Sequence, residues 1–162
     1  MRKPTLPIAL AALAVCAAAI AVPVAARPAG GHAAPSGTLV LTGKAAPADQ
    51  KTIEAAPKGE SVGDRLLQSE TLRRNGRPAA RAESDCMLVD ATYEGAQCTI
   101  TLLLGNGSLV LGGASVSKHI PGVGGTDDPY TILGGTGAYE GASGTAQVNT
   151  TSKGDTVVIR FE

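Results

Sequence analysis

Asparagine–glycine pairs between alternating apolar runs are the feature that most constrains how this chain can fold. Asn75-Gly76 joins VGDRLLQSETLRR to RPAARAESDCMLVD, and Asn106-Gly107 joins CTITLLLG to SLVLGGASV. A two-residue type I′ turn requires positive φ at both positions, which asparagine and glycine adopt at little cost. The two pairs therefore predict two antiparallel β-hairpins.

The other periodic segments are also typical of short strands, and no segment combines a helical apolar period with helix caps. Residues 44–60 contain two prolines and several charges, and we expect a long loop there. Eight short strands joined by turns predict an all-β domain, either a sandwich or a barrel. Besides the two hairpins, the predicted strands are residues 38–43, 128–135, 144–151 and 155–162.

The first hairpin also predicts which side chains point inward. If Asn75-Gly76 is a two-residue turn, Glu70 lies opposite Arg81 as an exposed cross-strand ion pair. A β-bulge in this hairpin would exchange the two faces. Without a bulge, the inward face carries small, apolar or hydroxylic side chains: Leu67, Ser69, Thr71, Ala80 and Ala82.

The N-terminus has the pattern of a secretory signal peptide. Arg2 and Lys3 precede the apolar residues 8–22, and Val24 and Ala26 suit a signal-peptidase site. This apolar run is shorter than the roughly 20 residues that span a bilayer. We expect a signal peptide over 1–26, a flexible segment over 27–37 and a secreted, extracellular domain over 38–162.

The cysteines leave two alternatives open. Cys16 would permit a lipid anchor, but Val15 is bulky for such a site and the apolar run continues past it. After signal removal, Cys86 and Cys98 remain, and two cysteines in an exported domain are usually bonded. We expect a Cys86–Cys98 disulfide, with a free thiol at Cys86 as the alternative.

Composition excludes several classes of function. Basic and acidic residues number 14 each, and the chain has three tyrosines, one phenylalanine and no tryptophan, so nucleic acid is not an expected partner. The two histidines, His32 and His119, and the lack of a C-x-x-C pair predict no metal site. No segment after the signal is apolar enough to predict a membrane span.

The glycine-rich stretch TILGGTGAYEGASGTAQV decides against a nucleotide cofactor. A dinucleotide loop has the form G-x-G-x-x-G between a strand and a helix. Gly135 and Gly137 fit the first pair, but Gly141 falls one residue late and no helix pattern follows. We expect no cofactor, and predict instead a strand over 131–133, a turn over 134–137 and a returning strand.

Three segments resemble the allene oxide cyclase and dirigent proteins. GGTGAYEGASG is similar to that family's G-G-[ST]-G-x-[FY]-x-G-[AR]-x-G signature, and VGDRLLQSETLRRNGRPAARAESDCMLV and AQCTITLLLGNGSLVLGG look like earlier segments of it. The resemblance implies an eight-stranded antiparallel β-barrel whose apolar cavity binds a lipophilic or phenolic small molecule. It also implies that homo-oligomers occur among relatives.

The catalytic groups of that family are not found at matching positions. The first strand, TLVLTG, lacks an acid or amide, Gly113-Ala114 stands where the cyclase has a tyrosine, and a disulfide would consume the thiol of Cys86. Glu83 and Asp85 are expected to point outward, and His119 lies in a loop that could cap the barrel. The weak catalytic candidates are Arg65 facing inward beside Cys86, Tyr130 at the barrel mouth, and Arg160 entering the interior.

Two hypotheses for function follow. The first is a secreted barrel that binds a small lipophilic molecule and, as the resemblance implies, steers a cyclisation or isomerisation, because holding a substrate near its reactive shape lowers the barrier. The second is a non-catalytic carrier or structural barrel with a filled or ligand-binding core. The sequence leaves open whether the chain is an isomerase of this type or no enzyme.

Overall fold

The computed structural model describes residues 34–55, 58–92, 95–116 and 127–162. Within those residues the chain forms nine β-strands and one short 3-10 helix, η1, and no helix is long and apolar enough to cross a membrane. The elements are β1 (Gly37–Gly43), η1 (Pro47–Asp49), β2 (Gln50–Ile53), β3 (Arg65–Arg74), β4 (Arg77–Asp90), β5 (Gly95–Leu104), β6 (Gly107–Val116), β7 (Asp127–Gly137), β8 (Gly144–Thr151) and β9 (Gly154–Phe161).

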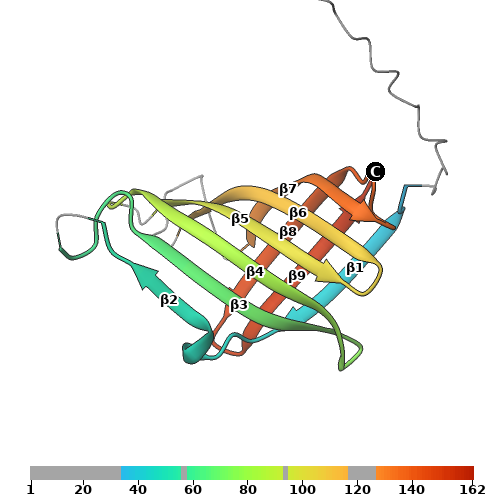
Figure 1. The fold of residues 1–162 in the computed structure, drawn as a ribbon, viewed down its shortest axis with the longest axis horizontal. Helices are drawn as coiled ribbons and strands as arrows, with labels where there is room; N and C mark the ends of the chain where they lie inside the picture. Colours follow the sequence, from blue (N-terminus) through green and yellow to red (C-terminus); the bar gives the residue numbers. More distant parts are fainter. Residues whose placement is uncertain (1–33, 56–57, 93–94, 117–126) are drawn as a thin grey trace, which may run out of the picture. The chain divides into compact units, whose positions relative to one another are not determined.

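Eight of these strands close into an antiparallel barrel (Figure 1). The strands follow one another around the wall in the order β1-β9-β8-β7-β6-β5-β4-β3, and β1 pairs with β3 to complete the circle. Closure removes the free strand edges that would otherwise template aggregation. The eight-stranded antiparallel barrel expected from the sequence is thus confirmed.

The ninth strand, β2, was missed by the sequence analysis, which placed a loop over 44–60. Its four residues, QKTI, are all exposed and pair only with β3, between Gln50↔Gln68 and Ile53↔Arg65. The alternation of apolar and polar residues that marks a strand requires one buried face. A short strand with both faces in solvent has no such signal.

The seam between β1 and β3 is the irregular part of the wall. At one end of the seam, β1 pairs with β3 only at Thr42↔Arg73. At the other end, the pairing of β2 with β3 begins at Gln50↔Gln68. Residues 44–49, which connect β1 to β2 and contain η1, do not pair with β3. Glu70 and Thr71 of β3 therefore lie where neither β1 nor β2 continues the ladder.

A bulge reverses the predicted faces of β3. The turn at Asn75-Gly76 forms as expected, with φ of 51° and 77°, and Arg74 pairs with Arg77. The register then shifts between Leu72 and Arg73, which leaves Ala79 of β4 as the extra residue. Ala80 and Ala82 still face inward, but on β3 the inward residues are now Leu66, Gln68, Glu70 and Leu72. The predicted exposed pair Glu70–Arg81 is therefore wrong, because Glu70 is buried.

The middle of the barrel is filled by aliphatic side chains. Six of them have no exposed surface: Leu41, Leu72, Leu102, Leu109, Leu111 and Ile159. At one end the rings of Tyr139 and Phe161 stack with their centroids 6.1 Å apart, and both pack against this core. The interior is thus close-packed in its centre, as protein interiors generally are.

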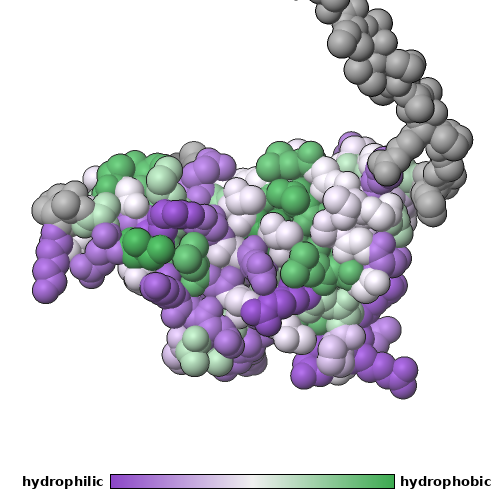
Figure 2. Space-filling model, in the orientation of Figure 1, coloured by the Kyte–Doolittle hydropathy of each residue, from purple (hydrophilic) through white to green (hydrophobic). Residues whose placement is uncertain are grey.

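The outer wall is mixed in character. Figure 2 shows hydrophobic patches on one face separated by hydrophilic side chains, with no continuous apolar surface. Apart from Leu66, which faces inward at one end of the barrel, the exposed large apolar residues come from several different strands and one loop: Val40, Ile53, Val62, Met87, Val89, Leu103 and Leu133. Isolated apolar residues on a surface are normal and carry no functional meaning by themselves.

The glycine-rich stretch closes one end of the barrel, with different boundaries from those expected. β7 continues to Gly137, so Gly134, Gly135 and Gly137 belong to the strand, and the turn covers residues 138–143. The register between β6 and β7 shifts at Leu133, whose side chain is left exposed. The second Asn-Gly signal is also displaced by one residue: Leu104 pairs with Gly107, so the hairpin turn is Gly105-Asn106.

One of these glycines is required by packing rather than by its backbone angle. A Cβ on Gly135 would lie 2.5 Å from the carbonyl oxygen of Tyr139 and 2.7 Å from that of Ser108. We expect Gly135→Ala to lower the free energy of unfolding by about 1–3 kcal/mol, because two backbone segments must move apart. Urea denaturation measures this change. Gly105→Ala is the matched control, since nothing lies within 4 Å of its Cβ position, and equal stabilities of the two variants would contradict the packing argument.

Candidate functional site

The two ends of the barrel differ in chemistry. The closed end is made by the hairpin turns 75–76 and 105–106 and the turn 138–143. The opposite end, called here the open end, is formed by the first residues of β3, β5, β7 and β9 and the last residues of β1, β4, β6 and β8. By strand alternation and burial, inward-facing polar residues gather in the half near the open end: Gln68, Glu70, Ser84, Ser115, Asp128, Thr150 and Asp155.

A cavity of about 430 Å³ lies at the open end and is called here the mouth cavity. Its floor is apolar, made by Leu66, Leu88, Ala96 and the Cys86–Cys98 disulfide, with the hydroxyl-bearing Ser115 beside them. Its rim is polar, with Thr52, Glu54, Glu60, Asp64 and Arg65. An apolar floor with a few polar groups around it is the usual form of a small-molecule site.

Hydrogen bonds to one carboxylate hold the rim in place. Asp64 accepts hydrogen bonds from the backbone N–H of Ala55 at 2.6 Å and from the N–H and hydroxyl of Ser61 at 2.9 and 3.1 Å. These hydrogen bonds lower the pKa of the Asp64 carboxyl, and the bond from Ala55 has the largest effect. The backbone of Leu88 also donates to the Asp64 carbonyl at 2.8 Å. The rim is therefore fastened to the end of β4 and has a defined shape.

The disulfide forms part of the floor. Cys86 and Cys98 are direct cross-strand partners on β4 and β5, with Cα atoms 4.0 Å apart, and their sulfur atoms are bonded. The expected disulfide is present, so Cys86 offers no thiol to a ligand. Cys98 is buried, which makes the bond a link between the core and the mouth cavity.

Tyr130 lies inside the barrel next to this floor. Tyr130 pairs with Gly113, which in turn pairs with Cys98, so the three side-chain positions are neighbours across β5, β6 and β7. Gly113 makes room for the ring, since a Cβ there would lie 2.7 Å from a ring carbon. Burial, with the charge of Asp128 as a second cause, raises the pKa of Tyr130 to about 12. Its hydroxyl therefore remains a hydrogen-bond donor at neutral pH.

A pair of carboxyl groups, the buried Glu70 and the partly buried Asp155, occupies the seam of the barrel. Glu70 is only 8% exposed, and it approaches β1 closely because Gly43 has no side chain: a Cβ there would lie 2.6 Å from Glu70 Oε2. Burial, then the charge of Asp155 and a hydrogen bond with its carboxyl, raise the pKa of Glu70 from 4.5 to about 7. Oε2 of Glu70 is buried without any hydrogen-bond partner.

A second, smaller space of about 180 Å³ lies beside this pair and is called here the side cavity. Asp155 lines it directly, as does Gln68, the inward neighbour of Glu70 on β3. Gln50 Nε2 donates to Gln68 Oε1 at 3.0 Å, which ties β2 to β3 at this place. The other lining residues are Lys44, Ala45, Thr150, Thr151 and Gly154.

The arginines named as candidates from the sequence do not enter the interior. Arg65 lies on the rim and points to the outer wall, where its Nε donates to Asp85 Oδ1 at 3.0 Å and its terminal nitrogen to Oδ2. Arg160 is exposed, because Ile159 and not Arg160 faces the core. Asp85 and Glu83 point outward as expected, paired with Arg65 and Arg81. His119 falls outside the described residues.

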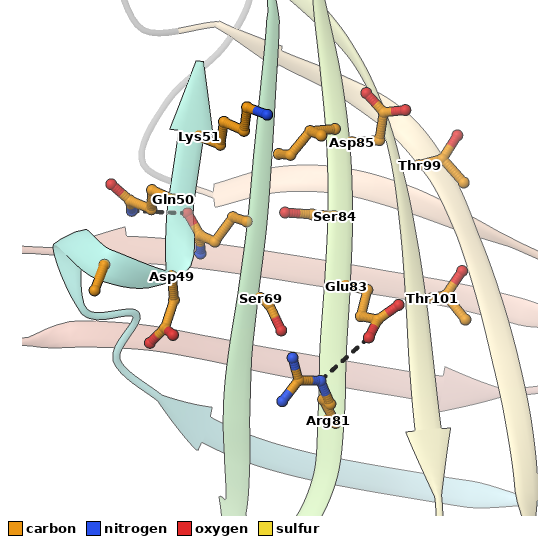
Figure 3. A pocket seen from close by; sticks show the side chains of 13 residues that line it. Asp49, Gln50, Lys51, Ser69, Arg81, Glu83, Ser84, Asp85, Thr99 and Thr101 are labelled. Atoms are coloured by element: carbon orange, nitrogen blue, oxygen red, sulfur yellow. Dashed lines mark hydrogen bonds and ion pairs between the residues drawn. The ribbon is translucent and has the colours of Figure 1, made fainter. Parts of the chain in front are cut away.

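A hollow of about 800 Å³ on the outer wall is a weaker candidate (Figure 3). It spans the outer faces of β3, β4 and β5 beside β2, and its lining is almost wholly polar. Several of those groups already have partners: Arg81 Nε donates to Glu83 at 3.1 Å, and Gln50 binds Gln68. A ligand on this open surface would bury little apolar area, and several of the polar groups there already bind one another. The mouth cavity is therefore the better site.

The sequence analysis missed both members of the carboxyl pair. Asp155 could have been found, because it alternates with Val157 and Ile159, which form a buried face. Glu70 could not be assigned without knowing the bulge at Ala79, which changes its face.

The fold is that of an allene oxide cyclase or dirigent-like barrel, as the following comparisons show. No family model matches the sequence, and no curated protein matches it. Three of the solved structures that share the fold are described here. A pyocyanin demethylase has a TM-score of 0.64 at 19% identity, covering 78% of this chain and 100% of that one. A pterocarpan synthase dirigent protein has a TM-score of 0.56 at 18% identity, covering 76% and 90%.

The third is described as a nonspecific heme-binding cyclase that catalyses a [4 + 2] cycloaddition during neoabyssomicin biosynthesis. It has a TM-score of 0.57 at 16% identity, covering 79% of this chain and 66% of that one. At these identities the likeness establishes the fold alone.

The raised pKa of Glu70 predicts how stability depends on pH. The pKa of the Glu70 carboxyl is about 7 in the folded state and 4.5 in the unfolded chain, so the folded protein binds this proton more tightly. The contribution of Glu70 is therefore fully present below about pH 4.5 and is lost as the pH rises through about 7, a change of up to about 3 kcal/mol. We expect Glu70→Gln to remove this decline, so that the variant is more stable than the wild type at pH 8.

Urea denaturation at several pH values between 4.5 and 8 measures the difference. Glu83→Gln is the matched control, because Glu83 lies on the outer wall and its substitution should leave the pH profile unchanged. A wild-type and Glu70→Gln difference that stays constant with pH would show that Glu70 ionises normally.

Proposed function

We propose that this protein is an exported barrel that binds a small, largely apolar molecule at its open end and steers a cyclisation or isomerisation of that molecule. The observation that carries the proposal is the mouth cavity, which combines an apolar floor with a fixed polar rim inside a closed barrel. Its volume of about 430 Å³ lies within the range of small-molecule sites.

The shape of the cavity supports a steering role. The floor is held by a disulfide between two neighbouring strands, and the rim by three hydrogen bonds to Asp64. A rigid cavity restricts a flexible substrate to few conformations, and such restriction alone can lower the barrier to ring closure. Tyr130 and Glu70 are two buried groups that can assist by donating a hydrogen bond or a proton, since the pKa of each is raised.

The names of the structural neighbours agree with this class of role. One is a demethylase of pyocyanin, one a pterocarpan synthase and one a cyclase. These three proteins act on organic small molecules according to those names. For this chain the same class of ligand is a proposal that rests on the mouth cavity.

A non-catalytic carrier is the second candidate, and the filled centre of the barrel favours it. Leu102, Leu109 and Leu111 have no exposed surface, and the mouth cavity lies at one end of the barrel, away from them. Incubation of an extracted natural ligand with fresh protein separates the two roles. A product with a changed chromatographic retention supports the cyclase or isomerase, and an unchanged ligand supports the carrier.

Filling the mouth cavity tests the binding proposal. We expect Ala96→Phe to weaken binding of the neutral fluorescent probe N-phenyl-1-naphthylamine about tenfold or more, because the new ring occupies the floor. Fluorescence titration measures the affinity, and thermal melting confirms that the variant folds. Ala114→Phe is the matched control, since Ala114 is exposed on the outer face of the neighbouring strand. Equal loss in both variants, or no loss in either, would contradict a site in the mouth cavity.

Export is proposed from the N-terminal pattern, and the disulfide supports it, because such bonds persist in oxidising compartments. We expect the full chain, expressed in a secreting host, to appear in the exported fraction with Arg27 as its first residue. Intact-mass spectrometry should also show the loss of two hydrogens for the Cys86–Cys98 bond. Recovery of only an uncleaved chain with free thiols inside the cell would overturn the proposal.

A further inference from the structure

We propose that the ligand of the open end carries an ammonium group, and that the Glu70–Asp155 pair binds this group in the side cavity. The inference rests on the proposed function, since it assumes that the open end takes a small molecule. It goes beyond what the resemblance implies, which is a lipophilic or phenolic small molecule.

The first argument is the unsatisfied acceptor. Oε2 of Glu70 is buried and has no hydrogen-bond partner. A buried acceptor without a donor costs about 1–3 kcal/mol, and native structures rarely retain one without a reason. A ligand group with N–H or O–H bonds would satisfy this oxygen, whereas a carboxylate would not.

The second argument is the charge of the open end. Among the described residues that line the two cavities, acidic side chains outnumber basic ones, and both basic residues have partners of their own. Arg65 forms its ion pair with Asp85 on the outer wall, and Lys44 Nζ donates to the Ser152 carbonyl at 3.4 Å. A site of this sign attracts cations and repels anions. Its acids are Glu54, Glu60, Asp64, Glu70, Asp128 and Asp155.

The third argument separates an ammonium from a hydroxyl. With no ligand, a proton shared between the two carboxyls relieves the repulsion of their charges. An ammonium group relieves it better, since it donates several charge-assisted hydrogen bonds to both carboxylates while the shared proton passes to water. The ionisable groups that border the side cavity among the described residues are Asp155 from β9 and Lys44 after β1, while β1 and β4 present Gly43 and Ala82 to Glu70.

The two cavities are close enough for one ligand. Leu66 lines the mouth cavity and Gln68 lines the side cavity, and they are successive inward positions on β3. Such positions are roughly 7 Å apart along a strand. A bicyclic aromatic body against Leu66 therefore places a one-carbon amine near Gln68, which lines the side cavity together with Asp155.

A matched set of three probes tests the inference: naphthalen-2-ylmethylamine, naphthalen-2-ylmethanol and naphthalene-2-carboxylate. Calorimetric titration of the full protein at pH 8 should show the amine binding at least about tenfold more tightly than the carboxylate, with the alcohol between them. Below about pH 7, the pKa of Glu70, the affinity for the amine should fall about tenfold per pH unit, because it then competes with the shared proton.

Substitutions identify the groups responsible. Glu70→Gln should abolish both the preference for the amine and its pH dependence, and Asp155→Asn should do the same if the first variant fails to fold. Glu83→Gln, on the outer wall, should change neither. Equal affinities for the three probes, tighter binding of the carboxylate, or a preference that persists in the folded variants would overturn the inference while leaving small-molecule binding intact. Failure of all three probes to bind would overturn both.

Discussion

Closure of the barrel through β1 and β3 is the constraint on which the rest of the structure depends. The two strands meet only at Thr42↔Arg73, because the sheet is strongly sheared and β1 ends level with the far end of β3. The first half of β3 therefore lacks a partner from β1, and the exposed strand β2 covers it. The detour of residues 44–49 between these two pairings leaves a gap in the wall, and Glu70 lies in that gap.

The two halves of the interior have different tasks as a result. In the middle of the barrel, leucine side chains with no exposed surface stabilise the fold by burying apolar area. At the seam, the same barrel contains the buried Glu70, whose ionisation costs stability. Cores generally exclude polar groups that lack hydrogen-bond partners. Functional sites often contain such groups, and a protein tolerates them where the rest of the core is well packed. The leucine-filled half is therefore what allows the polar half to exist.

The sequence predicted the elements of this fold better than their faces. The hairpin at Asn75-Gly76, the eight barrel strands and the Cys86–Cys98 bond follow from local patterns, and the structure contains each of them. One extra residue, Ala79, was enough to turn Glu70 from a predicted surface residue into a buried acid. Side chains alternate with a period of two along a strand, so a slip by one residue exchanges inside and outside. No local pattern marks such a bulge, and this limits how far sequence alone can define the site.

The position of the glycine-rich stretch explains why the resemblance extends to the scaffold and not to the chemistry. Gly135 and Gly137 allow β7 to pass close to the backbone of neighbouring segments, and the turn that follows closes the end opposite the mouth cavity. A family signature at the closed end therefore indicates how that end of the barrel is closed, and not which ligand the barrel binds. The residues that line the mouth cavity come instead from strand termini and connecting segments at the open end, so the signature and this cavity lie in separate parts of the barrel.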